Sequence, residues 1–392
     1  MTSQSSGALP RSADVVIVGG GAVGLSAAYH LAAAGAGRVL LLEREAELGT
    51  GSTGRCAGGF RHQFSSRVNV ELSLASIPLI TGFSATHGLP VDVVQDGYLF
   101  LLRDEATWSE YLAAAEMQRG LGVDVQLLDA TEVGELVPGL ATEGIVGATF
   151  CAQDGIADPS GLTLGFATAA RRAGAEIRTR VAVTRIEVDG DAAVGVETAL
   201  GPVACGVVIN AAGPWGGELA ATAGVDLPLE PVPRVVLVSG PFPGVPARRT
   251  LVVDAASSFY FHREGEGVLM GMGDPAERPT FEMRVDDRFV AEELLPTAIC
   301  VLPALGDAAI AHSWVGLYEM TPDRHPILGP VPGVAGLLLA NGFSGHGFQH
   351  APIVGKLLAE IVVEGRARTV DISSLGLDRF AAGRLVGEVH VV

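Results

Sequence analysis

The chain has 392 residues and a formal net charge of −18, with 44 acidic and 26 basic residues. This charge disfavours nucleic acid and anionic membrane surfaces as partners, although arginines in a pocket can still bind an anionic substrate. The length favours two domains, and the absence of a continuous apolar run of about 18 residues predicts no membrane span.

The cysteines and the N-terminus bound the cellular setting. Cys56, Cys151, Cys205 and Cys300 are scattered and show no metal-ligand spacing, so we expect no metal site, buried thiols and a cytoplasmic location. Residues 1–12 are polar and lack the apolar segment of a signal peptide, which predicts a disordered tail.

Residues 14–43 predict a strand, a helix and a second strand. Residues 14–18 form a β-branched run that is typical of a buried parallel strand. Residues 22–34 are rich in alanine and predict a helix, and residues 38–42 are again apolar. This order is that of a βαβ unit.

The turn between strand and helix carries the pattern G-x-G-x-x-G at Gly19, Gly21 and Gly24. Gly19 permits the tight turn, Gly21 lets the backbone approach a pyrophosphate, and Gly24 lets the helix pack close to the sheet. The helix N-terminus offers N–H groups to phosphates, and Glu43 can accept hydrogen bonds from a ribose hydroxyl. The unit predicts dinucleotide binding; the alternative is an ordinary βαβ unit with a glycine turn.

The next segment is a polar loop, residues 47–67, which carries Arg55, Arg61 and His62 and should cross the ligand. A helix is expected over residues 68–87, kinked or divided by Pro78. A second domain then begins, with expected strands at 97–103 and 123–128 and a helix at 106–119.

The remaining elements alternate between the two domains. Asp158 and Pro159 start a helix over 159–173, and residues 207–217 (VVINAAGPWGG) repeat the strand-to-glycine-turn pattern of the nucleotide domain. Further strands are expected at 176–186, 192–200, 201–209, 235–239, 251–253, 259–262, 268–272 and 336–340, with helices at 286–300 and 349–363.

These elements predict an α/β protein, α+β overall, in which a Rossmann-type FAD-binding domain is interleaved with a mainly antiparallel-sheet substrate domain. We expect residues 1–88, 145–234 and 311–392 in the first domain and residues 89–144 and 235–310 in the second.

Four stretches together carry a family resemblance: residues 16–24 (VIVGGGAVG), 51–64 (GSTGRCAGGFRHQF), 207–215 (VVINAAGPW) and 316–356, which contains GLYEMTPDRHPILGP and NGFSGHGFQHAP. The chain resembles the FAD-dependent amino acid and amine oxidoreductases of the D-amino acid oxidase and sarcosine oxidase group. It looks most similar to sarcosine oxidase β-subunits and proline dehydrogenase β-subunits.

The resemblance and the glycine unit together imply the FAD contacts. The helix that follows GFSGHGF would direct its N-terminus at the flavin and stabilise negative charge on the reduced ring. The expected FAD-binding residues are Gly19, Gly21, Ala22, Val23, Gly24, Glu43, Arg44, Ser52, Thr53, Arg55, Cys56, Ala57, Gly58, Gly59, Val181, Ala211, Gly213, Trp215, Gly342, Ser344, Gly345, His346 and Gly347.

The resemblance also implies a substrate site. Arg61 matches the arginine that holds the substrate carboxylate in sarcosine oxidase-like enzymes; the alternative is an arginine that pairs with the flavin or another charge. Gln349 replaces the family's second anchor, a lysine, which suggests a different or larger acid. The other expected catalytic or pocket residues are Tyr260, Arg263, Tyr318 and His346.

Two further departures concern oxygen and flavin attachment. Residues 267–273 carry Leu269 and Met270 where related oxidases place a lysine above the flavin, so a dehydrogenase is favoured, unless Arg263 supplies the positive charge. The covalent cysteine is missing at residues 316–318, and Arg55 stands where a covalent histidine would be, so FAD should be non-covalent.

The leading hypothesis is oxidation of an amino acid or secondary amine by hydride transfer to flavin N5, giving an imine. No base is identified; His346, His62 or a water could accept the proton. A 2-hydroxy acid dehydrogenase is one alternative, which a well-placed histidine base would favour. A flavin-bearing subunit of a larger complex is another, and either a homo-oligomer or a partner subunit for electron transfer is compatible with the sequence.

Overall fold

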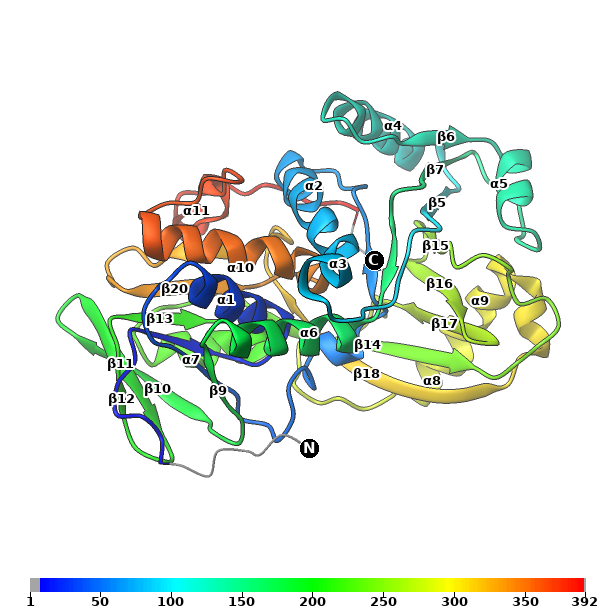
Figure 1. Cartoon of the computed structure of the whole chain (residues 1–392). Helices are drawn as coiled ribbons and strands as arrows, with labels where there is room; N and C mark the ends of the chain where they lie inside the picture. Colours follow the sequence, from blue (N-terminus) through cyan, green and yellow to red (C-terminus); the bar gives the residue numbers. More distant parts are fainter. Residues whose placement is uncertain (1–7, 391–392) are drawn as a thin grey trace.

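The structure is a computed structural model that describes residues 8–390. Two lobes lie side by side, each built on one large sheet (Figure 1). The expected disordered tail falls mostly on residues 1–7, outside the described part, but its last residues are ordered. Ser12 forms a bridge with Ala204, whose N–H donates to Arg11 O at 3.0 Å, so the tail prediction was wrong for these residues.

The first lobe is a three-layer Rossmann-type domain. Its central sheet has the order β19 (Ile327–Pro330), β20 (Leu337–Asn341), β13 (Val207–Asn210), β1 (Val15–Val18), β2 (Val39–Leu42) and β9 (Glu176–Arg178), and only β19 pairs antiparallel. Alternate residues of a strand face opposite sides. Val15 and Ile17 therefore pack with the helices, while Val16 and Val18 join the core on the other side.

Two different layers cover the faces of this sheet. Helices α1 (Ala22–Ala33), α6 (Pro159–Arg172) and α10 (Gly347–Glu364) pack on one face. The other face carries helix α7 (Gly216–Ala221) and a small antiparallel sheet of β10 (Val183–Asp189), β11 (Ala192–Thr198) and β12 (Val203–Ala204). The expected order of strand, glycine turn and helix at the start of the chain is confirmed.

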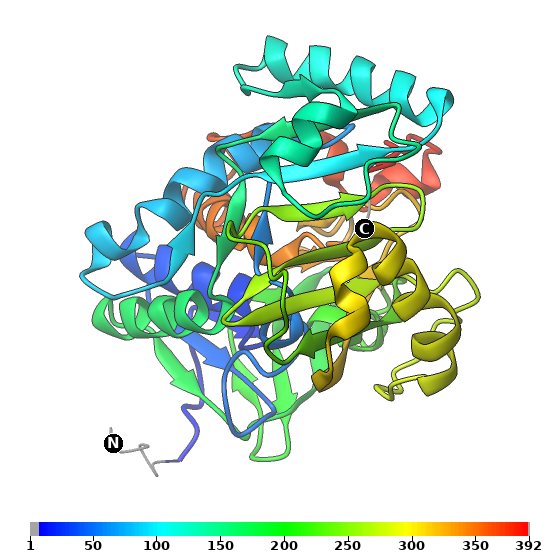
Figure 2. The same ribbon diagram turned by 90° about the vertical axis from the view of Figure 1, so that its right-hand side faces the viewer.

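The second lobe is built on a mainly antiparallel sheet of eight strands (Figure 2). Its order is β18 (Ile310–Met320), β14 (Glu230–Ser239), β17 (Gly267–Met272), β16 (Phe259–Glu264), β15 (Leu251–Asp254), β5 (Tyr98–Leu102), β7 (Gly147–Cys151) and β6 (Gln126–Leu128). One face, including Leu237, Phe261 and Met270, packs in an apolar core against α5 (Ala130–Leu136), α8 (Asp287–Phe289) and α9 (Leu295–Val301). The other face turns toward the first lobe.

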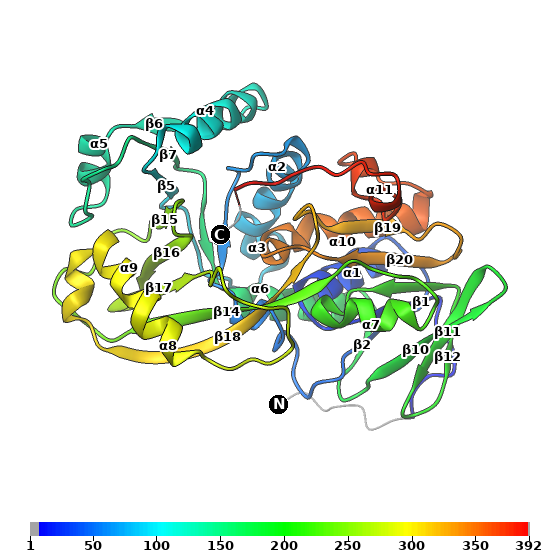
Figure 3. The same ribbon diagram turned by 180° about the vertical axis from the view of Figure 1, so that it is seen from behind.

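Smaller elements join the lobes. Helices α2 (Arg67–Thr81) and α3 (Phe83–His87) and the short strands β3 (Gly59–Phe60), β4 (Val93–Val94) and β8 (Gly155–Ala157) lie between them, α4 (Glu105–Gly120) flanks β5 and β7, and α11 (Asp378–Ala381) follows α10. The long strands β14 and β18 pair over their whole length and run toward the first lobe (Figure 3). No helix within residues 8–390 combines the length and apolarity that crossing a bilayer needs.

Several expected elements differ in detail. Pro78 is accommodated within α2, and the helix divides later, at Gly82. The expected helix over 286–300 is interrupted by a π-helical stretch at Val290–Leu294. Tyr318 was expected on a strand, but the length of that strand, β18, was not. Both β7 and β14 pair within the eight-stranded sheet, so this sheet extends beyond the expected substrate-domain boundaries at residues 144 and 235.

Candidate functional site

A deep cavity of about 340 Å³ lies where the carboxyl ends of β1 and β2 meet the open face of the eight-stranded sheet. This is the crevice in which doubly wound sheets bind their ligands. The nucleotide-domain side is lined by expected residues: Gly19, Gly21, Ala22, Val23, Glu43, Arg44, Ser52, Thr53, Arg55, Cys56, Ala57, Gly58, Gly59, Val181, Ala211, Gly213, Trp215, Gly345 and Gly347. Tyr260 and Tyr318 line the opposite side.

The three motif glycines have the geometry that their proposed jobs require. Gly19 has φ of +115°, which an L side chain rarely adopts. A Cβ at Gly24 would overlap the carbonyl oxygen of Gly19, so this glycine permits the close approach of α1. A Cβ at Gly21 would meet only Thr53 Oγ1, at 3.3 Å, and would otherwise project into the cavity. The backbone at Gly21 is therefore open to a phosphate group.

Glu43 and Arg44 form the far end of the cavity. Glu43 Oε2 accepts from Gly20 N at 2.6 Å and Oε1 from Glu45 N at 2.8 Å, which fixes the carboxylate beside the glycine turn. The Arg44 guanidinium lies 3.7 Å over the ring of Trp215. Both residues line the cavity, so they can contact the ribose and base end of a dinucleotide.

The loop that follows β2 crosses from one lobe to the other. Thr53 Oγ1 accepts from Ala22 N at the start of α1 at 3.2 Å, and Ser52 Oγ donates to Leu317 O on β18 at 2.6 Å. Arg55 Nη1 donates to Val315 O at 3.0 Å. Burial raises the pKa of the Cys56 thiol to about 11, so this cysteine stays protonated. The loop thus fixes the cavity wall without offering a reactive thiolate.

The glycine turn between β20 and α10 forms the other end. A Cβ at Gly345, where φ is +94°, would lie 2.5 Å from the ring of Tyr318. Gly345 and Gly347 line the cavity, whereas Gly24, Gly342, Ser344 and His346, which we also expected to bind FAD, lie outside the described lining. A residue with a side chain at position 345 would therefore clash with Tyr318 of β18.

Arg61 lies in a buried network and does not line the cavity. Its guanidinium donates to Gln63 O and His390 O and lies 3.3 Å from His346 Nε2. Gln349 brackets the Arg61 backbone, accepting from its N–H at 3.0 Å and donating to its carbonyl at 3.2 Å. Burial and the charge of Arg61 hold the pKa of His346 well below its ordinary value, so its imidazole is neutral. In this arrangement Arg61, His346 and Gln349 stabilise one another.

Arg263 differs from the expectation as well. Along β16, Tyr260 and His262 share one face, and Arg263 falls on the other. Its Nε donates to Gly265 O at 3.0 Å and its Nη1 contacts Pro246 O and Ala247 O at 3.3 Å. Arg263, which we expected in the pocket, therefore does not line the cavity and supplies no positive charge there. On the neighbouring strand Leu269 shares the face of Tyr260, whereas Met270 packs in the opposite core.

Three polar residues that the sequence analysis did not assign line the substrate-domain side: Tyr98, Arg234 and Glu319. Tyr98 (β5) and Arg234 (β14) lie on the same open face of the sheet as Tyr260 and Tyr318. The pairing registers of the strands determine that these four side chains share one face. Glu319 Oε1 accepts from Phe343 N at 3.3 Å, and its buried Oε2 has no partner among the described residues. Burial raises the pKa of Glu319 to about 7.

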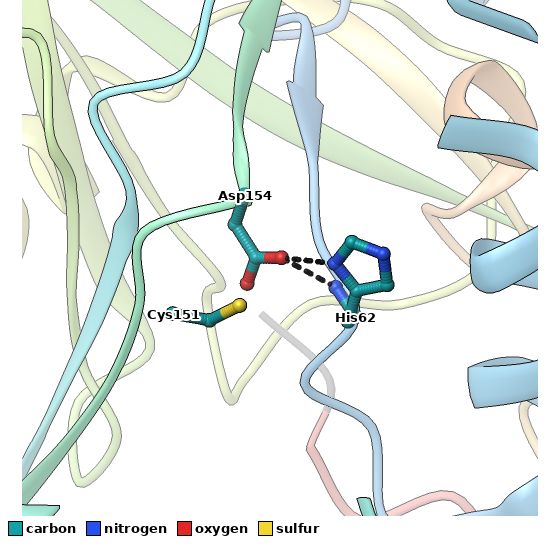
Figure 4. A group of neighbouring side chains, drawn as sticks. All are labelled: His62, Cys151 and Asp154. Atoms are coloured by element: carbon teal, nitrogen blue, oxygen red, sulfur yellow. Dashed lines mark hydrogen bonds and ion pairs between the residues drawn. The ribbon is translucent and has the colours of Figure 1, made fainter. Parts of the chain in front are cut away.

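A second buried cluster is structural. The Asp154 carboxylate accepts from His62 N at 2.8 Å, lies 2.7 Å from His62 Nδ1, and accepts from Gln63 Nε2 at 3.1 Å, with Cys151 beside it (Figure 4). Burial raises the pKa of the Cys151 thiol far above its usual range, so the thiol is protonated in this cluster. The cluster joins the segment after β3, which carries His62 and Gln63, to the turn after β7. His62 is thereby held away from the cavity lining.

Comparisons with known proteins agree with this geometry. The sequence model of the family DAO, described as FAD dependent oxidoreductase, matches residues 14–361. FAD-dependent oxidoreductase domain-containing protein 1 of Xenopus laevis is 34% identical, over 98% of this chain and 85% of that protein. Mitochondrial sarcosine dehydrogenase of Mus musculus is 30% identical over 95% of this chain, which spans 42% of that protein. The solved structure of L-proline dehydrogenase from P. horikoshii superposes with a TM-score of 0.89 and 31% identity, covering 96% of this chain and 100% of that one.

Proposed function

The chain belongs to the DAO family of FAD-dependent oxidoreductases, and from this premise we propose that it oxidises the C–N bond of an amino acid or a secondary amine to an imine. The observation that carries the proposal is the cavity itself, which joins a dinucleotide cradle to a face bearing Arg234 and the phenols of Tyr98, Tyr260 and Tyr318. Related proteins whose names specify sarcosine or proline as substrate support this substrate class.

The residues of the cavity fit FAD. Gly21 leaves room for the pyrophosphate at the N-terminus of α1, Glu43 and Arg44 flank the nucleotide end, and the turn before α10 borders the flavin end. Bound FAD supplies the two-electron oxidation by accepting hydride from the carbon next to nitrogen. No cysteine or histidine occupies the expected covalent positions, which supports non-covalent binding.

The protein's own groups then orient the substrate and take up a proton. An amine gives up hydride readily only when its nitrogen is neutral, so a base near the cavity helps. Glu319 Oε2 is unpartnered, and a pKa of about 7 lets the carboxylate accept a proton near neutral pH. We include Glu319 in the proposal as the proton acceptor, because His62 and His346 lie outside the described lining.

The lining favours amine oxidation over 2-hydroxy acid oxidation. A well-placed histidine base would favour 2-hydroxy acid oxidation, and no histidine occurs among the described residues that line the cavity. A dehydrogenase is favoured over an oxidase, because Leu269 lies on the cavity-facing side of β17 and the Arg263 side chain points away from the cavity. Electrons would then pass to another acceptor, through a partner subunit or a second copy. The four free cysteines support a reducing, cytoplasmic setting.

Anaerobic mixing of the purified flavoprotein with amines, amino acids and 2-hydroxy acids tests the proposal. We expect amines or amino acids to bleach the flavin absorbance and hydroxy acids to leave it unchanged. Bleaching by hydroxy acids alone would overturn it. The same reduced protein, exposed first to air and then to an artificial electron acceptor, should reoxidise slowly in the first case and fast in the second.

The Glu319→Gln variant tests the proton acceptor. In the variant, the rate of flavin reduction by an active amine should no longer fall as the pH drops below about 7, while the FAD content stays the same. An unchanged pH profile would show that the base lies elsewhere.

A further inference from the structure

Arg234 presents an incompletely paired cation to the cavity. It lies on β14 opposite Gly316, with its guanidinium carbon 5.2 Å from the ring centre of Tyr318. Nη1 donates to Pro233 O at 2.9 Å and to Glu277 Oε2 at 2.5 Å. Nε is buried and has no partner among the described residues. A guanidinium with a free N–H in a cavity is suited to a second carboxylate.

Glu277 reaches Arg234 from a loop, residues 273–286, that we call the latch loop. Thr280 N donates to Pro231 O at 2.8 Å, and the ring of Phe281 stacks on Trp215 with centroids 5.7 Å apart. Since Trp215 also lines the cavity, the latch loop borders the FAD-binding residues and Arg234 together. The latch loop therefore connects the Glu277–Arg234 pair with the cavity margin.

In the ion pair between Arg234 and Glu277, another carboxylate can replace Glu277. The side chains of Arg234 and Glu277 are each 19% exposed, so both charges are largely desolvated. Burial raises the pKa of Glu277 to about 7, although the charge of Arg234 acts in the opposite direction. The pair uses one guanidinium nitrogen, whereas a bidentate carboxylate would use two. An incoming carboxylate can therefore compete with Glu277 for Arg234.

We propose, on the premise of the function above, that Arg234 anchors the substrate's carboxylate and that Glu277 is an internal carboxylate which holds this anchor until the substrate displaces it. The substrate class is then an amino acid or N-substituted amino acid with a free carboxylate, not a simple amine. Arg61 does not fill this role, because its guanidinium already donates to two backbone carbonyls and contacts His346.

Titration of the FAD-loaded protein with benzoate, followed by the flavin absorbance change, tests the anchor without turnover. Benzamide serves as the neutral probe. Wild type should bind benzoate in preference to benzamide, and Arg234→Met should weaken benzoate binding by about 10- to 100-fold while leaving benzamide unaffected. Arg234→Lys, which keeps the charge but loses the planar fork, should fall between them and covers the case in which Arg234→Met does not fold.

The Glu277→Gln variant tests the competition. Removing the internal charge should tighten benzoate binding by about fivefold. The matched control is Glu282→Gln in the same loop, where the side chain is 70% exposed and lies 3.9 Å from Arg284; it should change nothing. Weaker binding in Glu277→Gln would show that Glu277 positions Arg234 and does not compete with the ligand, which overturns the proposal. Unchanged binding in Glu277→Gln, or in both Arg234 variants, overturns it as well.

Backbone hydrogen exchange reads out the latch loop directly. Benzoate should speed exchange at the amides of Ala276 and Glu277, which donate to Asp274 at 2.7 and 3.2 Å. Slower exchange would mean that the ligand closes the loop, contrary to the proposal. These binding readouts do not need turnover. If hydroxy acids alone reduce the flavin, the proposed function fails while the anchor stands; if amines reduce it without involving Arg234, the anchor alone fails.

Discussion

Asp323 and Arg379 form a two-pronged ion pair, with Nε–Oδ2 of 2.8 Å and Nη2–Oδ1 of 3.0 Å, and both side chains are at most 2% exposed. Arg379 also donates to Leu375 O and His325 O, at 2.8 and 2.9 Å. Burial acts to raise the pKa of Asp323, but the hydrogen bond and charge of Arg379 hold this pKa below its usual value. The pair joins the segment after β18 to helix α11.

Breaking this pair should cost much more than breaking an exposed one. Arg379→Met leaves a buried, unpaired carboxylate, so we expect the free energy of unfolding to fall by about 3–5 kcal/mol. The matched control is Arg384→Met, which removes an exposed pair with Asp378 at 2.6 Å and should cost less than about 1 kcal/mol. Urea denaturation of the three proteins measures both; equal losses would contradict the prediction.

Glu388 should make stability depend on pH. Its carboxylate accepts from the backbone and hydroxyl of both Ser65 and Ser66 and from Asn69 Nδ2. Burial works to raise the pKa of Glu388, but the hydrogen bonds from Ser65 and the charge of Arg61 outweigh it and hold the pKa well below its usual value. The ionised form therefore stabilises the fold above the ordinary glutamate pKa of about 4.3, and this stability is lost as the pH falls below it.

Glu388→Gln should remove that dependence. We expect lower thermal stability than wild type at pH 7 and a shallower loss of the melting temperature as the pH falls from about 5 to about 2. Glu292→Gln, which alters an exposed pair with Arg288 at 2.8 Å, should follow the wild-type curve. Parallel curves for wild type and Glu388→Gln would contradict the role assigned to this carboxylate.

Two glycines of the first turn should separate folding from cofactor binding. Gly24→Ala places a Cβ on the carbonyl of Gly19, so the apoprotein should lose about 1–3 kcal/mol of stability. Gly21→Ala meets only a threonine hydroxyl and projects into the cavity, so the apoprotein should melt normally but retain less FAD. Apoprotein melting and the flavin-to-protein absorbance ratio test both; loss of fold in Gly21→Ala would refute this division.

The latch loop predicts that benzoate affinity rises as the pH falls from 8 to 6. Glu277 becomes protonated near pH 7 and then no longer competes for Arg234, while benzoate stays ionised. The other charged groups beside Glu277 are Asp274, Arg284 and Asp286, and Tyr318 lies on the far side of Arg234, with its ring centre 5.2 Å from the guanidinium carbon. In the double variant Glu277→Gln, Glu319→Gln the affinity should stay level over this range, because Glu319 of the cavity lining also has a pKa raised to about 7. A persisting slope in the variant would assign the titration to a neighbour.

Thiol reactivity should follow burial. Burial raises the pKa values of Cys56 and Cys205 to about 11, and that of Cys151 still further. Cys300 is exposed, so the expectation of buried thiols was wrong for this residue. Iodoacetamide at neutral pH should therefore alkylate Cys300 alone in the native holoprotein, and all four cysteines after denaturation. Peptide mass spectrometry measures this; rapid native labelling of Cys56 would contradict it.

The spacing of neighbouring residues was sufficient to predict the elements whose residues are close together in the sequence. The strand, turn and helix around Gly19–Gly24 and the glycine turn before α10 follow from neighbouring residues, since glycine tolerance and apolar runs are local properties. The cavity-lining roles of Tyr260 and Tyr318 remained open until their strands were paired. Their inward direction depends on which residue of β16 faces which residue of β17 and β14.

Long-range packing explains what the sequence did not show. Arg234 follows Pro233 in a strand of no distinctive pattern, and only its pairing opposite Gly316 places it in the cavity. The burial of Arg61 depends on His390, more than 300 positions away in the chain, whose carbonyl accepts from the guanidinium. Such contacts leave no periodic signal between the two partners.

The interleaving of the two sheets limits how this protein can be re-engineered. β5, β6 and β7 enter the eight-stranded sheet before β13 joins the sheet of the other lobe. The chain then returns to the eight-stranded sheet with β14 to β18 before β19 and β20 complete the other one. A chimera that borrows the substrate half of a relative cannot be made at a single splice point. Grafting short cavity-facing stretches of individual strands, with their registers preserved, is the route that this topology leaves open.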